Sequence, residues 1–200
     1  MRILPSGERA LLIEVEDSTA VHALARALAQ VAGVIDVVPA ARTVLLTCAP
    51  EALDGVRSLA ADLTPDEVSA ADTGEEVVID VHYDGEDLDD VARMTGLSTT
   101  EVIARHTGAT YTADFLGFAP GFAYLSGLDP ALHVPRLDTP RTSVPAGAVA
   151  IAGGRAAVYP RSSPGGWRLL GHTDAVLFDP EADPPALLQA GIRVRFREVG

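Results

Sequence analysis

Residues 149–160 read VAIAGGRAAVYP, and this stretch determines what the second half of the chain can form. Apolar residues flank the adjacent glycines Gly153 and Gly154. A two-residue hairpin turn of the primed type places positive φ angles on its central residues, which glycine adopts without steric cost. The stretch therefore predicts a β-hairpin that turns at these two glycines.

The sequence from Tyr111 onward repeats this pattern of short apolar runs between turn signals. Ten of the fourteen prolines lie between Pro120 and Pro185, which indicates many short strands joined by long loops. The closing run IRVRFREV, residues 192–199, alternates apolar residues with arginine and predicts a strand with one buried face. We expect a compact β barrel or sandwich, preceded by two short helices broken at Gly96.

The first segment alternates strand and helix signals in the order β-α-β-β-α, over residues 10–15, 18–31, 34–38, 43–48 and 51–63. Residues 64–76 are polar and acidic with little periodicity, which predicts a linker or a domain edge. The sequence therefore predicts an α+β protein. A small N-terminal α/β domain is expected over residues 1–75 and a β-rich domain over residues 76–200.

The charged residues are distributed unevenly, and all fifteen basic side chains are arginine. The absence of lysine excludes a Schiff-base lysine and the lysine of a Walker A phosphate loop. Residues 1–110 hold 20 acidic residues and 7 arginines, whereas residues 111–200 hold 8 of each. Within residues 136–172 five arginines accompany a single aspartate, so we expect an anion to bind there rather than in the acidic first half.

The same composition disfavours several classes of function. Residues 92–102 have the spacing of a helix-turn-helix, but their acidic surroundings would repel phosphates, so we expect no nucleic-acid partner. The five histidines are scattered and Cys48 is the single cysteine, so no metal ligands are evident. No apolar run approaches the roughly 20 residues that cross a bilayer, and the start shows no export signal. We expect a soluble cytoplasmic protein that does not contact a membrane.

Residues 114–127, DFLGFAPGFAYLSG, mix large rings with glycines. Five of the ten aromatic residues lie within residues 111–124. Pro120 and Gly121 suit the two central positions of a type II turn. Aromatic rings on both sides of such a turn have two interpretations. They pack in the core beneath the barrel, or they line a ligand pocket or a subunit interface. The composition does not decide between the two.

A second stretch, SSPGGW at residues 162–167, places adjacent glycines beside the only tryptophan of the chain. Together with FLGFAPGFAYL (115–125) and TPRTSVPAGAVAIAGG (139–154), it closely resembles the family of 5-oxoprolinase B-type subunits, also called allophanate hydrolase subunit 1 or the KipI family. The resemblance covers nearly the whole chain. It implies a small N-terminal α/β domain followed by a cyclophilin-like β barrel.

The resemblance also implies that this chain is one part of a carboxyltransferase-like module. The other part is the C-type subunit, the KipA-type protein or allophanate hydrolase subunit 2, and a further A-type subunit makes up a whole 5-oxoprolinase. The assembled enzyme is expected to use ATP as a co-substrate and to open the lactam ring of 5-oxoproline to glutamate, while this chain alone is inactive. Allophanate or urea-derived amides are alternative substrates, and inhibition of a sensor histidine kinase by binding is an alternative role.

Carried over position by position, the resemblance implies two groups of site residues. The first group is expected to bind a small amide or carboxylate substrate: Arg141, Gly147, Arg155 and His172. Arg141 is the best candidate for holding a carboxylate or phosphate, because its planar guanidinium can bind one bidentately. The second group is expected at a pocket or partner surface: Phe118, Pro120, Gly121, Phe122, Ser163, Pro164, Gly165, Gly166 and Trp167.

Two of these positions depart from the pattern of the family. Arg155 stands where a glutamine is common, and His172 stands where an arginine is common. Three others, Phe118, Pro120 and Phe122, are expected to form part of the surface at which the C-type subunit docks, because large apolar side chains left in water create an adhesive patch.

Overall fold

A computed structural model describes residues 1–63 and 76–200. The chain divides into two compact units, Met1–Thr73 and Gly74–Gly200. The domain edge expected at residue 75 falls among residues 64–75, outside the described residues. Each unit is therefore considered by itself.

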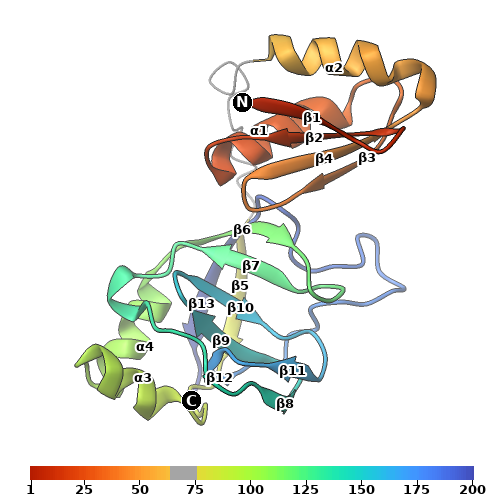
Figure 1. Ribbon diagram of the computed structural model, residues 1–200. Coiled ribbons are helices and arrows are strands. Elements are labelled where there is room, and N and C mark those ends of the chain that lie inside the picture. Colours follow the sequence, from red (N-terminus) through yellow and green to blue (C-terminus); the bar gives the residue numbers. More distant parts are fainter. Residues whose placement is uncertain (64–75) are drawn as a thin grey trace. The chain divides into compact units, whose positions relative to one another are not determined.

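Unit 1 is an antiparallel sheet with two helices packed on one face (Figure 1). Its strands pair in the order β1-β2-β4-β3, with bounds Arg2–Ser6, Ala10–Glu14, Thr43–Cys48 and Val34–Pro39 respectively. The helices are α1 (Ser18–Ala29) and α2 (Leu53–Asp62), the latter preceded by a 3-10 turn at Pro50–Ala52. Alternate residues of β2 and β4 point toward both helices, so one apolar core holds the unit together.

Strand β1 was not predicted from the sequence, for a physical reason. This strand lies at the edge of the sheet and none of its residues is buried, so it carries little of the apolar alternation that identifies a strand. Its backbone pairs with β2 in register from Arg2 opposite Glu14 to Ser6 opposite Ala10.

Unit 2 is a nearly closed β barrel, as expected for a cyclophilin-like domain. Its main sheet has the strand order β12-β9-β10-β7-β6-β13-β5. In that order the bounds are Arg168–His172, Ala148–Ala152, Arg155–Val158, Ala123–Ser126, Tyr111–Leu116, Arg193–Glu198 and Glu76–Val81. A second, two-stranded sheet consists of β8 (Arg141–Val144) and β11 (Ser163–Gly165). The unit also contains the helices α3 (Leu88–Thr95) and α4 (Thr99–Gly108) and a 3-10 turn at Pro130–Leu132.

The two predicted helices are confirmed, and their ends follow from the sequence. Gly96 ends α3 in a left-handed conformation with φ of 71°, and Ser98 and Glu101 form the expected capping box at the start of α4. The closing run is also confirmed as a strand, with Val194 and Phe196 buried.

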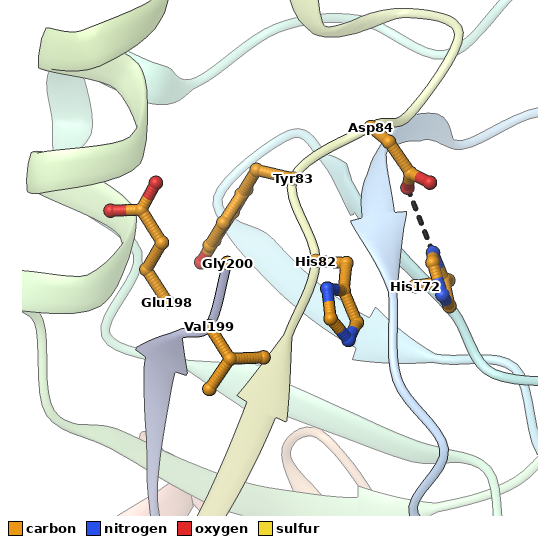
Figure 2. Close-up of a pocket in the computed structure, with 7 residues that line it drawn as sticks. All are labelled: His82, Tyr83, Asp84, His172, Glu198, Val199 and Gly200. Atoms are coloured by element: carbon orange, nitrogen blue, oxygen red, sulfur yellow. Dashed lines mark hydrogen bonds and ion pairs between the residues drawn. The ribbon is translucent and has the colours of Figure 1, made fainter.

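The barrel closes where β5 continues past Val81 and meets the end of β12. His82 and His172 exchange two backbone hydrogen bonds, each 2.9 Å long, so they stand directly opposite each other (Figure 2). Gly171 permits this approach, because a Cβ atom on it would lie 2.1 Å from the carbonyl oxygen of His82. We call this closure, defined by His82, Gly171 and His172, the seam.

The hairpin predicted at Gly153 and Gly154 is confirmed, with Ala152 paired to Arg155 across a two-residue turn. The expectation that both glycines have positive φ angles is wrong. Only Gly153 does, with φ of 56°. This agrees with a type II′ turn, in which the first central residue alone requires a positive φ.

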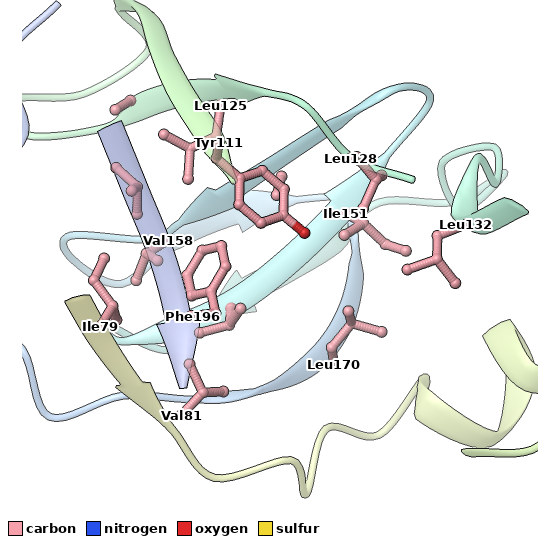
Figure 3. Packing of buried hydrophobic residues seen from close by; sticks show 14 of the residues in the cluster. Ile79, Val81, Tyr111, Leu125, Leu128, Leu132, Ile151, Val158, Leu170 and Phe196 are labelled. Carbon is pink, nitrogen blue, oxygen red and sulfur yellow. The ribbon is translucent and has the colours of Figure 1, made fainter. Parts of the chain in front are cut away.

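Two apolar cores occupy opposite faces of the barrel wall. The interior core is filled by residues that include Tyr111, Ile151 and Phe196 (Figure 3). A second cluster, here called the outer aromatic cluster, includes Phe122, Tyr159 and Trp167 and lies against the alanines of β9. In the described part of the chain, no helix is long and apolar enough to cross a membrane.

Candidate functional site

The seam brings together an imidazole and a carboxylate. His172 Nδ1 lies 2.8 Å from Asp84 Oδ1, and the His172 ring stacks on His82 with ring centroids 5.0 Å apart (Figure 2). The hydrogen bond from His172 is the main cause that holds the pKa of the Asp84 carboxyl below its ordinary value. Asp84 therefore stays ionised, and it fixes the orientation of the His172 ring.

His172 borders two hollows. The first has a volume of about 430 Å³ and is lined by His82, Tyr83, Asp84, His172, Glu198, Val199 and Gly200. The second has a volume of about 390 Å³ and is lined by Asp84, Gly85, Glu86, Pro145, Ala146, Ala148, Leu169, Gly171 and His172. We call the second one the seam hollow. Its small side chains leave room for a compact molecule beside the imidazole.

Arg141, expected to bind an anion, is held in an ion-pair network at the first residue of β8. Its Nη2 lies 2.8 Å from Asp87 Oδ2, its Nε lies 2.7 Å from Glu86 Oε1, and Nη1 donates to the carbonyl oxygen of Trp167 at 3.3 Å. Three of its five N–H groups are thus engaged by the protein itself. The guanidinium is linked to the seam hollow by its ion pair with Glu86, which lines the hollow.

Gly147 lies next to this hollow in the sequence, between the lining residues Ala146 and Ala148. Its φ of 79° and its approach to Thr173 both require glycine, since a Cβ atom would lie 2.3 Å from the Thr173 carbonyl oxygen. The Thr173 N–H donates to the Gly147 carbonyl oxygen at 2.9 Å. Gly147 therefore fixes the wall of the seam hollow through its backbone.

Arg155 lies elsewhere. It pairs with the buried Asp114, whose other oxygen accepts a hydrogen bond from Ser126 at 2.7 Å. The guanidinium also lies over the Phe115 ring, 5.3 Å from its centroid. Of the four expected substrate residues, His172 alone lines the seam hollow. Gly147 lies between two lining residues and Arg141 pairs with the lining residue Glu86, whereas Arg155 lies on another part of the barrel.

The expected turn at Ala119–Phe122 is confirmed by a 3.0 Å bond from the Phe122 N–H to the Ala119 carbonyl oxygen, and by the Gly121 φ of 78°. Just before it, the Ala119 N–H donates to the Gly117 carbonyl oxygen at 2.8 Å, which makes Phe118 the centre of a γ-turn with φ of 67°. A positive φ on a bulky residue is strained. Such strain is typical of functional sites.

The three residues expected to dock the C-type subunit have different environments. Phe118 is 60% exposed and Pro120 is exposed, but Phe122 is only 2% exposed. The Phe122 ring packs against Tyr159 and Trp167 at centroid distances of 5.4 and 5.8 Å. Phe122 is therefore a core residue, and only the other two residues can face a partner.

The SSPGGW stretch covers the outer aromatic cluster. Ser163 and Gly165 pair with β8, Pro164 is exposed, and Trp167 is buried beneath Arg136, whose guanidinium carbon is 5.7 Å from the ring centroid. Gly165 packs on Tyr159 so closely that a Cβ atom would lie 2.3 Å from the tyrosine hydroxyl. Gly165 therefore allows close packing within the chain. Gly166 is less constrained, because a Cβ atom on it would come no closer than 3.6 Å to another residue.

Asp84 and the pair of buried His106 and half-buried Tyr83 were not predicted from the sequence. His106 Nδ1 lies 2.6 Å from the Tyr83 hydroxyl, and burial lowers the pKa of His106 to about 3. Its Nε2 is buried without a hydrogen-bond partner among the described residues. No sequence signal marks Asp84, because its partner His172 is 88 residues away. Across the described ranges, no cluster of three or more His, Cys, Asp or Glu residues could hold a metal ion.

Fold and site together define a two-unit α+β protein whose cyclophilin-like barrel carries an oriented imidazole at its seam. Residues 1–188 match the family model described as "Carboxyltransferase domain, subdomain C and D". The chain belongs to this family.

Curated relatives agree with the family. The chain is 50% identical over 123 residues to the B-type subunit of 5-oxoprolinase from Bacillus subtilis, and the match covers 60% of this chain and 51% of that protein. It is 48% identical over 126 residues to the B-type subunit of 5-oxoprolinase from Haemophilus influenzae, covering 62% of this chain and 59% of that protein. The chain thus spans a little over half the length of the curated relatives that it matches.

Solved structures share the fold. The crystal structure of TTHA0988 matches 96% of this chain and 40% of its own chain, with 39% identity and a TM-score of 0.84. A conserved uncharacterized protein from Pyrococcus horikoshii matches 99% of this chain and 97% of its own, with 35% identity and a TM-score of 0.62. The Kluyveromyces lactis urea amidolyase, at 19% identity and a TM-score of 0.71, matches 98% of this chain and 15% of its own, and shows the fold alone.

Proposed function

We propose that this chain is the B-type subunit of an ATP-dependent amidohydrolase that opens the lactam ring of 5-oxoproline to give glutamate. The observation that carries the proposal is the 50% identity to a protein named as the B-type subunit of 5-oxoprolinase, over a segment of 123 residues. The seam hollow supports it, because a volume of about 390 Å³, with glycine or alanine at four of its nine lining residues, suits a compact cyclic amide.

In this proposal the activity requires the C-type and A-type subunits. An amide carbonyl is a poor electrophile, and ATP is the co-substrate that activates it by phosphorylating the amide oxygen. These 200 residues contain no lysine, so they cannot supply the lysine of a Walker A phosphate loop. Phe118 and Pro120 are assigned to the surface that meets the C-type subunit.

Within this chain, His172 borders the bound substrate, and Gly147 positions the backbone between the lining residues Ala146 and Ala148. Arg141 acts near the substrate through its ion pair with Glu86. Among the described residues, three of the five N–H groups of Arg141 are engaged, and the other two can donate to a carboxylate. Arg155 is assigned to the same reaction only if the assembled enzyme extends its site to Asp114 and Phe115.

The test is to co-express this chain with the A-type and C-type subunits, purify the complex and follow glutamate formation from 5-oxoproline with and without ATP. Glutamate should form only in the presence of ATP and of all three subunits. Allophanate and urea serve as comparison substrates. A correctly assembled complex that consumes one of these amides and leaves 5-oxoproline unchanged would replace the assignment.

A further inference from the structure

The imidazole of His172 lines both hollows at the seam. We propose that His172 is the proton acceptor of the hydrolytic step in the seam hollow, and that Asp84 is the residue that positions it. This inference rests on the proposed function, since it assigns a role within that reaction. The assignment is specific to this chain, because arginine, which is common at this position in the family pattern, cannot accept the proton.

The backbone holds both partners in place. His172 is fixed by its two hydrogen bonds to His82 across the seam. Asp84 lies between His82 and Gly85, and the Gly85 N–H donates to the Leu170 carbonyl oxygen at 3.0 Å. The distance of 2.8 Å between His172 Nδ1 and Asp84 Oδ1 is therefore set by two anchored segments rather than by two free side chains.

The hydrogen bond determines which ring nitrogen can react. An ionised carboxylate only accepts, so Nδ1 carries the proton and Nε2 of the neutral ring keeps its lone pair. Within residues 1–63 and 76–200, no hydrogen bond engages Nε2. The His172 side chain is 45% exposed, so this nitrogen is accessible to water or substrate.

The charged neighbours favour this role. The titratable side chains that line the two hollows beside His172 are His82, Tyr83, Asp84, Glu86 and Glu198. The side chain of Glu86 is paired with Arg141 at 2.7 Å, which leaves Asp84 as the carboxylate that directly contacts the imidazole.

The step is a balanced proton transfer. One O–H bond of a water molecule breaks as its oxygen bonds to the amide carbonyl carbon, and the proton moves to His172 Nε2. When the C–N bond breaks, the imidazolium returns that proton to the leaving nitrogen. Phosphorylation of the amide oxygen by ATP precedes this step and does not involve His172. Cleavage of the C–N bond then leaves the acyl phosphate of glutamate, and a second water molecule releases phosphate from it to give the carboxylate.

Two substitutions of His172 distinguish a role as proton acceptor from a role as a positive charge. In the assembled enzyme, His172→Gln should lower kcat by about 100-fold or more with little change in KM, because general base catalysis contributes ~10²–10⁴-fold. His172→Arg keeps a positive charge but cannot accept a proton, so it should fail equally. Asp84→Asn should cause an intermediate loss. His133→Gln, at an exposed histidine that lines neither hollow, is the matched control and should stay within about twofold of the wild type.

The pH profile adds a readout that a structural role would not affect. The fall of kcat/KM toward acid pH in the wild type should disappear from the residual activity of His172→Gln. A fully active His172→Arg enzyme, or an unchanged acid limb in His172→Gln, overturns the inference.

A second experiment uses this chain alone and does not depend on the proposed function. Diethylpyrocarbonate modifies neutral imidazole, and peptide mapping gives its rate at each histidine. His172 should react several-fold faster in the wild type than in Asp84→Asn, while the rate at His82 stays unchanged. If the complex does not turn over 5-oxoproline, the proposed function fails; equal rates at His172 in both proteins overturn the inference itself.

Discussion

Asp87 and Arg141 meet with 2.8 Å between Oδ2 and Nη2, and the same carboxylate oxygen accepts the backbone N–H of Leu169 at 2.7 Å. One carboxylate, located just before α3, thus connects β8 with β12. The Asp87 side chain is 5% exposed and that of Arg141 is 19% exposed, so both charges are largely removed from water. Such a pair holds its neighbours in a defined geometry more than it adds stability.

Removing one partner should therefore be costly. Asp87→Ala leaves Arg141 partly buried without its main counter-charge and should lower the free energy of unfolding by ~3 kcal/mol or more. Urea denaturation measures the loss. Glu86→Gln removes the exposed partner of the same guanidinium and should cost at most ~1 kcal/mol. Equal losses in the two variants would show that Asp87 has no special structural role.

The two phenylalanines that flank the Pro120–Gly121 turn should behave oppositely. Phe122→Ala creates a cavity in the outer aromatic cluster and should destabilise the fold by ~3–5 kcal/mol. Phe118→Ala should change stability little, because its ring is mostly in water. Thermal unfolding of both variants tests this contrast.

The backbone strain at Phe118 is separately testable. Phe118→Gly and Phe118→Ala both remove the ring, but only glycine adopts a φ of 67° freely. Phe118→Gly should therefore be more stable than Phe118→Ala by ~1 kcal/mol. In co-purification with the C-type subunit, Phe118→Ser should weaken association by ~2 kcal/mol if the ring is a central anchor. Undiminished association would remove Phe118 from the proposed interface.

Closure of the seam should depend on Gly171. Gly171→Ala places a methyl group against the His82 carbonyl oxygen and should separate β5 from β12, with increased hydrogen exchange at the amides of His82 and His172. Gly108→Ala, at the end of α4, has no heavy atom within 4 Å of the new Cβ and should be neutral or slightly stabilising. Unchanged exchange in Gly171→Ala would mean that the backbone can shift without opening the seam.

The stability of unit 2 should depend on pH through His106. Its pKa is lowered to about 3 in the folded state by burial, whereas an unfolded histidine titrates near ~6.5. The unfolded state therefore binds more protons between these pH values, and stability falls as the pH drops through this window. Measured by urea denaturation between pH 7 and pH 4, the wild type should lose more stability than His106→Asn. Parallel curves would contradict the assignment.

Local signals were sufficient for much of this fold. The capping box at Ser98, the helix stop at Gly96 and the hairpin at Gly153 each depend on residues a few positions apart, so the sequence displays them directly. The seam could not be predicted, because His82 and His172 are joined only by the path of the barrel. The same holds for Asp84 and Asp87, whose partners are 88 and 54 residues away.

The resemblance to a family correctly indicated the fold but could not assign an environment to each residue. Phe118 and Phe122 belong to one motif, yet one ring is in water and the other is in the core. Their difference follows from the γ-turn and the Pro120–Gly121 turn, whose combined geometry is a property of the folded backbone.

The parallel pairing of β5 with β13 has a consequence for the order of events during synthesis. Glu76 pairs with Arg193 and Val81 pairs with Glu198. The first strand of unit 2 therefore cannot form this pairing until its last strand has been synthesised. A ribosome adds ~5–20 residues per second, and the edge of β5 stays unpaired on that side for several seconds after it leaves the tunnel. Contacts of such long sequence separation also form slowly. Ile79 and Val81, which are buried in the finished barrel, would be available to chaperones until β13 pairs with β5.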